Sequence, residues 1–254
     1  MAGETMQSVE RLFIVVEAMA QKETVGVREL KTITGLNTTT IHRILSSLLE
    51  LGYVIQNHET DKYMLTYKWT ALGNAVYKKN AMVQLVHPYL KELAERIGDT
   101  VHFAERVGNN IRYIDKITPS SGIFAIGSFV GMELPIPNTG LGKAMLSQLP
   151  DEDVNRIWEE REKVVYTDKT IQDVNILKRE LHEARETGFA YDREEREVGI
   201  FCIATNIPDF NGGVRYALSV SASAGNMTED NLTRIKGLLL EGKKELMRLM
   251  GRKE

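Results

Sequence analysis

The sequence predicts an α+β protein in two parts: a small helical part that ends in a short hairpin, and a larger part built on antiparallel strands. Helical periodicity with one tight glycine turn dominates the first 66 residues, and β-like runs separated by turn residues recur after residue 99. All six prolines follow residue 87, so the first third of the chain lacks this helix breaker. We therefore predict one domain over 1–66, a helical linker over 67–80 and a second domain over 81–254.

The composition is that of a globular protein in a reducing compartment. Of the 254 residues, 43% are hydrophobic and 26% charged, and the formal charge of −3 shows no overall basic excess. The single cysteine, Cys202, excludes an intrachain disulfide framework and suits a reducing environment. The N-terminus lacks the basic start of a signal peptide, and no apolar run approaches the length of a membrane span. We expect a cytoplasmic protein with no membrane partner.

Two helices joined by a glycine-containing segment are expected first. Met6–Gln21 repeats apolar residues at helical spacing. Its predicted buried stripe is Val9, Leu12, Phe13, Val16 and Met19 or Ala20. Val27–Thr34 reads as a short second helix, buried through Val27, Leu30 and Ile33. Gly35 follows, and glycine most easily takes the positive φ that ends a helix.

A third helix and a hairpin complete the small domain. Asn37 or Thr38 is a good N-cap for a helix that runs to about Leu51. Its apolar face is Ile41, Ile44, Leu45, Leu48 and Leu49. Two β-like runs, Tyr53–Gln56 and Lys62–Thr66, are separated by a polar turn. Three helices and a hairpin, with a tight turn between the second and third helices, indicate a winged helix-turn-helix.

The solvent face of the third helix has the chemistry of a DNA reader. No carboxylate occurs from Leu30 to Leu49, although the chain holds 35 Asp and Glu in 254 residues. The exposed positions of this helix are Thr38, Thr39, Thr40, His42, Arg43, Ser46 and Ser47. Hydroxyls and one guanidinium suit phosphate oxygens and base edges, whereas acids would be repelled by the duplex. A plain helical bundle with a polar surface and a protein-binding winged helix remain as alternatives.

The larger domain alternates strands and helices. Ala81–Ile97 is an amphipathic helix through Met82, Leu85, Val86, Leu90, Leu93 and Ile97, with Pro88 inside it. Strands are expected at Thr100–Val107, Ile111–Thr118, Gly122–Phe129, Phe189–Asp192, Gly199–Ile207 and Val214–Ala222. Further helices are expected from Gly140 to about Leu149 and at Glu152–Glu160, Ile171–Thr187 and Glu229–Met250. Strands at both ends of the domain around central helices indicate an antiparallel α+β sheet.

No constellation in this domain supports catalysis or metal binding. The run from Gly140 to Lys143 fails the phosphate-loop motif, because Ala144 stands where a magnesium-binding Ser or Thr belongs. The carboxylates Asp192, Glu194 and Glu195 are expected to be a solvated turn rather than an acid/base pair. The five histidines show no metal-ligand spacing, and Cys202 lies in an apolar run that predicts an inert thiol. We predict no catalytic residue, metal or cofactor.

The N-terminal segments resemble a known family. The runs SVERLFIVVEAMA, VRELKTITGLNTTTIHRILSSLLELGYVIQN and DKYMLTYKWTALG are similar to the DNA-binding part of IclR-type transcriptional regulators. The resemblance implies that the third helix enters the major groove and that the wing contacts the backbone or the minor groove. It places groove contacts at Thr38, Thr39, Thr40, His42 and Arg43, with supporting contacts at Arg11 and Lys62.

The C-terminal segments resemble the effector-binding domain of the same family, a GAF-like fold. The matching runs are NTGLGKAMLS, TIQDVNILKRELHEAR, TGFAYDREEREVGIFCIATNIPD and YALSVSAS. The resemblance places effector contacts at Gly140, Leu141, Asp192, Cys202, Ser219 and Ser221, with apolar lining from Ile123, Ile126, Leu134 and Ile200. Ser219 and Ser221 alternate along one strand, so both hydroxyls face one side. Many relatives carry Ala or Ser where this chain has Gly140, a departure that would reshape the pocket.

These observations predict a ligand-responsive regulator of a catabolic operon. Its expected partners are a roughly palindromic double-stranded operator and a small effector, and the resemblance implies a homodimer or a dimer of dimers. Amides at a helix start favour an anion, so we expect a carboxylate effector. Asp192 would pair with a donor on it, such as a hydroxyl. The alternative is a small-molecule-processing enzyme with a winged-helix appendage, and a protein-binding module is a third.

Overall fold

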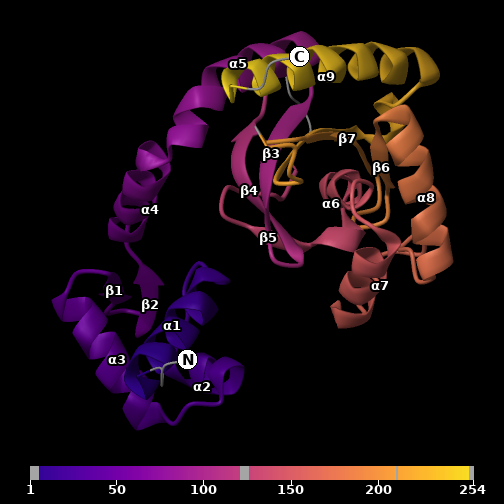
Figure 1. The fold of residues 1–254 in the computed structure, drawn as a ribbon. Coiled ribbons are helices and arrows are strands. Elements are labelled where there is room, and N and C mark those ends of the chain that lie inside the picture. Colours follow the sequence, from indigo (N-terminus) through magenta and orange to yellow (C-terminus); the bar gives the residue numbers. More distant parts are fainter. Residues whose placement is uncertain (1–5, 121–125, 210, 252–254) are drawn as a thin grey trace. The chain divides into compact units, whose positions relative to one another are not determined.

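The computed structural model describes residues 6–120, 126–209 and 211–251, and its chain divides into two units, Met1–Asn80 and Ala81–Glu254 (Figure 1). Each unit has its own apolar core. Among the described residues, no helix combines the length and the apolar character that crossing a membrane requires.

The first unit is a winged helix-turn-helix that continues into a further helix. Its elements are α1 (Gln7–Ala20), α2 (Val27–Thr34), α3 (Thr38–Glu50), β1 (Val54–Asn57), β2 (Lys62–Leu65) and α4 (Lys68–Lys79). Strands β1 and β2 pair as an antiparallel hairpin, which forms the wing. The fold class expected for this part of the chain is confirmed.

The turn between α2 and α3 is specified by two residues. Gly35 ends α2 with a φ of 70°, a left-handed conformation that glycine adopts without a Cβ clash. Asn37 caps α3, and its side chain accepts the backbone N–H of Thr40 at 2.8 Å. This cap starts α3 at the first residue of the hydroxyl-rich run.

The predicted buried stripe of α1 is partly wrong. Val16 and Met19 are buried as expected, but Val9 and Phe13 are 43% and 48% exposed, and Val15 is buried instead. Ile33 of α2 is also exposed. Helix α1 carries apolar residues on two faces, and periodicity cannot tell which face meets the small core formed with Leu30 and Ile41.

The described part of the second unit is built on a six-stranded antiparallel sheet of order β5-β4-β3-β8-β7-β6. The strands are β3 (Thr100–Val107), β4 (Asn110–Ile117), β5 (Glu133–Pro135), β6 (Ala190–Arg193), β7 (Ile200–Ile207) and β8 (Tyr216–Ser223). The helices are α5 (Ala81–Ile97), α6 (Gly140–Leu146), α7 (Asp151–Glu160), α8 (Val174–Thr187) and α9 (Glu229–Leu249), with a 3₁₀ turn at Ile136–Asn138.

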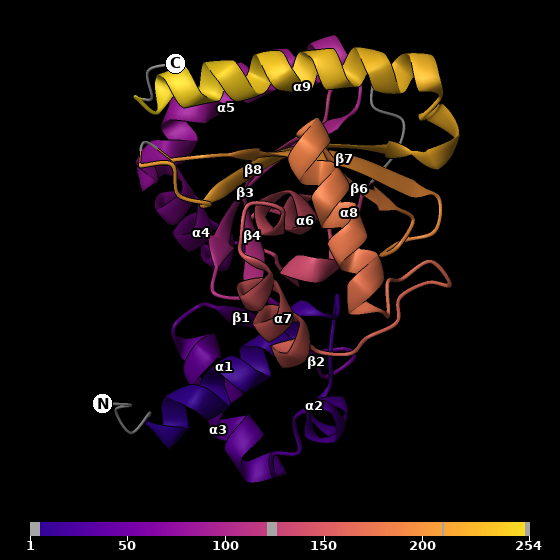
Figure 2. The same cartoon turned by 45° about the vertical axis from the view of Figure 1, so that its right-hand side comes forward.

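Helices cover both faces of this sheet. Figure 2 shows α5 and α9 side by side over one face, while α6 lies within the curve of the other face with α8 beside it. The central strand β8 is therefore buried along nearly its whole length, including Ser219 and Ser221. Polar side chains on such a strand need a partner or a ligand.

The strand expected at Gly122–Phe129 is not formed by its described residues, 126–129. The rest of that run lies outside the described residues. Lys116 of β4 donates from Nζ to the carbonyl oxygens of Ile126 and Ser128, at 2.7 and 2.6 Å, so a side chain holds this segment. The short strand β5 pairs with β4 further along. Leu85, expected on the buried face of α5, is 39% exposed.

Candidate effector pocket and nucleic-acid interface

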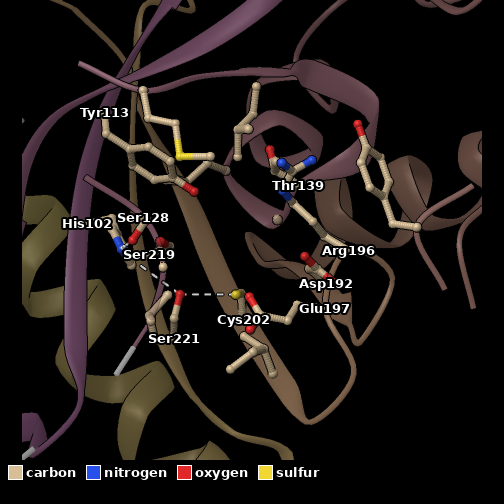
Figure 3. Close-up of a pocket in the computed structure, with 18 residues that line it drawn as sticks. His102, Tyr113, Ser128, Thr139, Asp192, Arg196, Glu197, Cys202, Ser219 and Ser221 are labelled. Atoms are coloured by element: carbon tan, nitrogen blue, oxygen red, sulfur yellow. Dashed lines mark hydrogen bonds between the residues drawn. The ribbon is translucent and has the colours of Figure 1, made fainter. Parts of the chain in front are cut away.

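A cavity of about 330 Å³ lies among β3, β7, β8, the start of α6 and the loop after β6 (Figure 3). Most of the predicted effector residues line it: Ile126, Leu134, Gly140, Leu141, Asp192, Ile200, Cys202, Ser219 and Ser221. Ile123 lies outside the described residues. The structure thus brings together residues that are up to 95 positions apart in the chain, from Ile126 to Ser221.

Strand register explains why these side chains meet. Asp192 of β6 lies opposite Cys202 of β7, and Cys202 lies opposite Ser221 of β8. Ser219 lies opposite His102 of β3. Residues that face one another across neighbouring strands project from the same side of a sheet, so these polar groups form adjacent rows on one wall of the cavity.

Sequence reasoning missed several lining residues. They are His102, Tyr113, Gly127, Ser128, Met132, Thr139, Tyr166, Arg196 and Glu197. The sequence offered one clue to His102, which is a polar residue between the apolar Val101 and Phe103 of β3. Figure 3 shows His102, Ser128, Ser219 and Ser221 gathered on one side of the pocket, with Thr139, Asp192, Arg196 and Glu197 on another.

The first side of the pocket holds a hydrogen-bonded chain of neutral groups. Cys202 Sγ lies 3.0 Å from Ser221 Oγ, which lies 3.4 Å from His102 Nδ1, and His102 Nε2 lies 2.7 Å from Ser128 Oγ. Burial and the nearby Lys116 lower the pKa of His102 to about 3, so the imidazole is neutral at physiological pH. This side therefore offers hydrogen bonds without a net charge.

The expected solvated turn at the end of β6 is wrong for Asp192 and Glu195, which are buried, whereas Glu194 is half-buried and pairs with Lys169. Asp192 and Glu195 are each 5% exposed, and Asp192 Oδ1 accepts the Glu195 N–H at 2.8 Å. Glu195 accepts from Lys143 Nζ at 2.5 Å, and Glu180 of α8 accepts from the same nitrogen at 2.6 Å. Burial raises the pKa of both Asp192 and Glu195, and Lys143 opposes this shift.

The start of α6 and Cys202 also line the pocket. Thr139 caps α6 by accepting the Gly142 N–H at 2.9 Å. Cys202 is half-buried, and its shielded surroundings raise the pKa of the thiol, which favours the unreactive protonated form. Among the described residues, no three His, Cys, Asp or Glu side chains gather as a metal site.

The predicted DNA-contacting residues lie on the first unit. Thr38, Thr39, His42 and Arg43 are exposed along α3, and Thr40 is half-buried. Arg11 of α1 borders a shallow groove together with Thr40 and Arg43. Lys62, at the start of β2, lies 3.8 Å from Glu29 of α2, so part of its charge is offset within the unit.

Two family models match the chain. The IclR helix-turn-helix domain matches residues 8–58, and the C-terminal domain of bacterial IclR transcriptional regulators matches residues 74–247. The DNA-binding transcriptional repressor YiaJ of Escherichia coli is 30% identical over 202 residues, which cover 79% of this chain and 72% of the relative.

Solved structures share the fold. The IclR structure from Thermotoga maritima is 28% identical, with a TM-score of 0.78 over 97% of this chain and all of that chain. An IclR homologue from Microbacterium hydrocarbonoxydans, crystallised in complex with 4-hydroxybenzoate, is 17% identical, with a TM-score of 0.77 over 96% of this chain and 99% of the other.

These relatives are transcriptional regulators, which decides against the enzyme alternative. The two matched domains occur in the same order as the two units and together span most of the chain. The protein belongs to the IclR family of transcriptional regulators.

Proposed function

We propose that this protein regulates a catabolic operon in response to a small organic acid that binds in the pocket of the second unit. The observation that carries the proposal is the convergence of Asp192, Cys202, Ser219 and Ser221 on one cavity. Buried hydroxyl and carboxyl groups on one wall are costly unless they serve a ligand or one another. The cavity, of about 330 Å³, is in the range for a small ligand.

Several features support an acid as the effector. Gly140 and Leu141 line the cavity at the start of α6, where backbone N–H groups favour an anion. Ser219 and Ser221 supply hydroxyls that can donate or accept. The homologue bound to 4-hydroxybenzoate is an example of this fold with a hydroxylated carboxylate.

The DNA side of the proposal is carried by α3. Thr38, Thr39, Thr40, His42 and Arg43 would read the major groove, with Arg11 and Lys62 on the flanking backbone. A two-fold symmetric assembly would match a roughly palindromic operator. Helix α4 has no buried residue within its own unit and exposes Leu72 and Val76, an apolar surface that self-association would cover.

The relative YiaJ is a repressor, which favours repression over activation here. A regulator of this kind would act in the cytoplasm, where bacterial DNA lies. Effector binding would then release or reposition the protein on its operator.

The pocket is tested by replacing its two serines. The double variant Ser219→Ala/Ser221→Ala loses up to two hydrogen bonds, so the affinity for an acid found by a thermal-shift screen should fall about five- to a hundredfold. Calorimetry measures this affinity. Ser223→Ala, on the same strand but outside the cavity lining, is the matched control and should bind normally. Wild-type affinity in the double variant would place the site elsewhere.

A further inference from the structure

Arg196 lies in the loop between β6 and β7, and its side chain lines the cavity. Figure 3 shows it beside Thr139 and Asp192, on the side of the pocket away from His102 and Ser221. Its guanidinium carbon lies 4.5 Å from the ring centre of Tyr166, so an aromatic face holds the group in place. The charge is therefore positioned at the pocket wall.

The guanidinium has an unused donor. Arg196 Nη1 is shielded from solvent and has no hydrogen-bond partner within the described residues. A buried N–H without an acceptor costs free energy, more so when the group is charged. A small shift of the side chain that turns Nη1 to the cavity would let a ligand oxygen accept this N–H and remove the cost.

Arg196 is the charged group of the described lining that can attract an anion, and its charge also acts on the nearby Asp192 carboxyl. Within the described lining, Arg196 is the one permanently cationic side chain, whereas Asp192 and Glu197 are acidic. Asp192 already accepts the N–H of Glu195. Lys143 is buried, is not among the lining residues and donates to Glu180 and Glu195. Without Arg196, the carboxylates of Asp192 and Glu197 would repel the carboxylate of a ligand.

We propose that Arg196 binds the carboxylate of the effector, and that the neutral groups His102, Ser128, Ser219 and Ser221 take a hydroxyl or carbonyl at its other end. The ligand class is a small hydroxy- or oxo-monocarboxylate. This inference rests on the proposed function and assigns the charge recognition to a named side chain. The planar guanidinium can form two parallel hydrogen bonds with a carboxylate.

Matched acids and amides test the assignment. The probes are 4-hydroxybenzoate, lactate and pyruvate, each beside its primary amide, which has nearly the same shape but no charge. In calorimetry with the full chain, at least one acid should bind wild-type protein ten times or more tighter than its amide. Arg196→Gln should weaken that acid about ten- to a hundredfold and leave the amide nearly unchanged. Arg196→Lys keeps the positive charge but loses the planar guanidinium that can form two parallel hydrogen bonds. Its affinity for the acid should lie between those of the wild type and Arg196→Gln.

Arg193→Gln is the control. Arg193 lies three residues away, stacks on Tyr191 and pairs with Glu180 at 3.6 Å, but it does not line the cavity. It should keep the preference for the acid. Unchanged acid affinity in Arg196→Gln, or an equal loss for acid and amide, would overturn the role of Arg196 while leaving acid sensing intact. Wild-type protein for which neither these probes nor the thermal-shift screen yields a bound acid contradicts both proposals.

Discussion

At the residue scale, Gly142 of α6 leaves no room for a side chain. A Cβ on Gly142 would lie 1.9 Å from the carbonyl oxygen of Ile136, and a backbone atom cannot move aside cheaply. A Cβ on Gly140 would meet its nearest neighbour, the Asp192 nitrogen, at 3.4 Å. The two glycines of one short helix therefore have different reasons for being glycine.

We predict that Gly142→Ala lowers the free energy of unfolding by about 1–3 kcal/mol or more, because α6 must shift away from the preceding turn. Gly140→Ala should change it by less than about 1 kcal/mol, since the new methyl group has room and alanine favours a helix. Urea unfolding of both variants measures the difference. Equal stability of the two variants would contradict the close approach.

His102 predicts a pH dependence of stability. Its pKa of about 3 in the folded protein lies below the ordinary value of 6.5, so between these values the unfolded chain binds a proton that the folded chain does not. The free energy of unfolding should fall as the pH drops from 6.5 towards 3, by up to about 1.4 kcal/mol per unit from this group. Asp192 and Glu195, with raised pKa values, act in the opposite direction.

The difference between wild type and His102→Gln isolates this effect, because both proteins share the two carboxyls. The free energies of unfolding of wild type and His102→Gln, measured at pH 7, 6 and 5, should converge as the pH falls. A stability difference that stays constant over this range would contradict a buried neutral imidazole.

At the element scale, the exposed face of α3 predicts how DNA recognition fails. Arg43→Ala should leave the fold intact, since the side chain is exposed. It should lower the free-energy difference between specific and non-specific DNA binding by about 1–3 kcal/mol. The ratio of specific to non-specific affinity at fixed salt measures it. Lys22→Ala, an exposed cation outside α3, is the control and should preserve the ratio.

Salt separates DNA binding from protein binding at this surface. Affinity for DNA should fall steeply as salt rises, because phosphate contacts release counterions. An unchanged ratio in Arg43→Ala would remove α3 as the reader, and affinity insensitive to salt would favour a protein partner.

Local signals predicted elements well where the residues themselves specify them. Gly35 and Asn37 mark the turn before α3 in the sequence and do so in the structure. Tertiary contacts decide which face of α1 is buried and which conformation residues 126–129 take. Periodicity does not reveal such contacts, for example the hydrogen bond from Lys116 to the Ile126 carbonyl.

The pocket was predictable to the extent that its strands were. Ser219 and Ser221 alternate along β8, so their common side follows from the sequence alone. Arg196 was not predictable, because its role depends on a loop that folds towards Tyr166, from a distant segment. Lys143 belonged to a failed phosphate-loop motif, and only the structure shows it joining α6 to Glu180 and Glu195.

At the scale of the whole molecule, the surface that we propose for DNA and the pocket that we propose for the effector lie in different units of one chain. Regulation requires that filling the pocket changes the affinity for DNA. Such coupling is reciprocal: if the effector changes DNA affinity by some factor, DNA must change effector affinity by the same factor.

The most direct test is the affinity of the full chain for its selected operator, with and without a saturating concentration of the acid that fills the pocket. We predict a change of about five- to 150-fold, matched by the same factor in acid affinity when DNA is bound. The Ser219→Ala/Ser221→Ala variant should bind the operator normally without acid and need more acid for the same change. Operator affinity that stays the same while calorimetry shows the pocket filled would contradict the account.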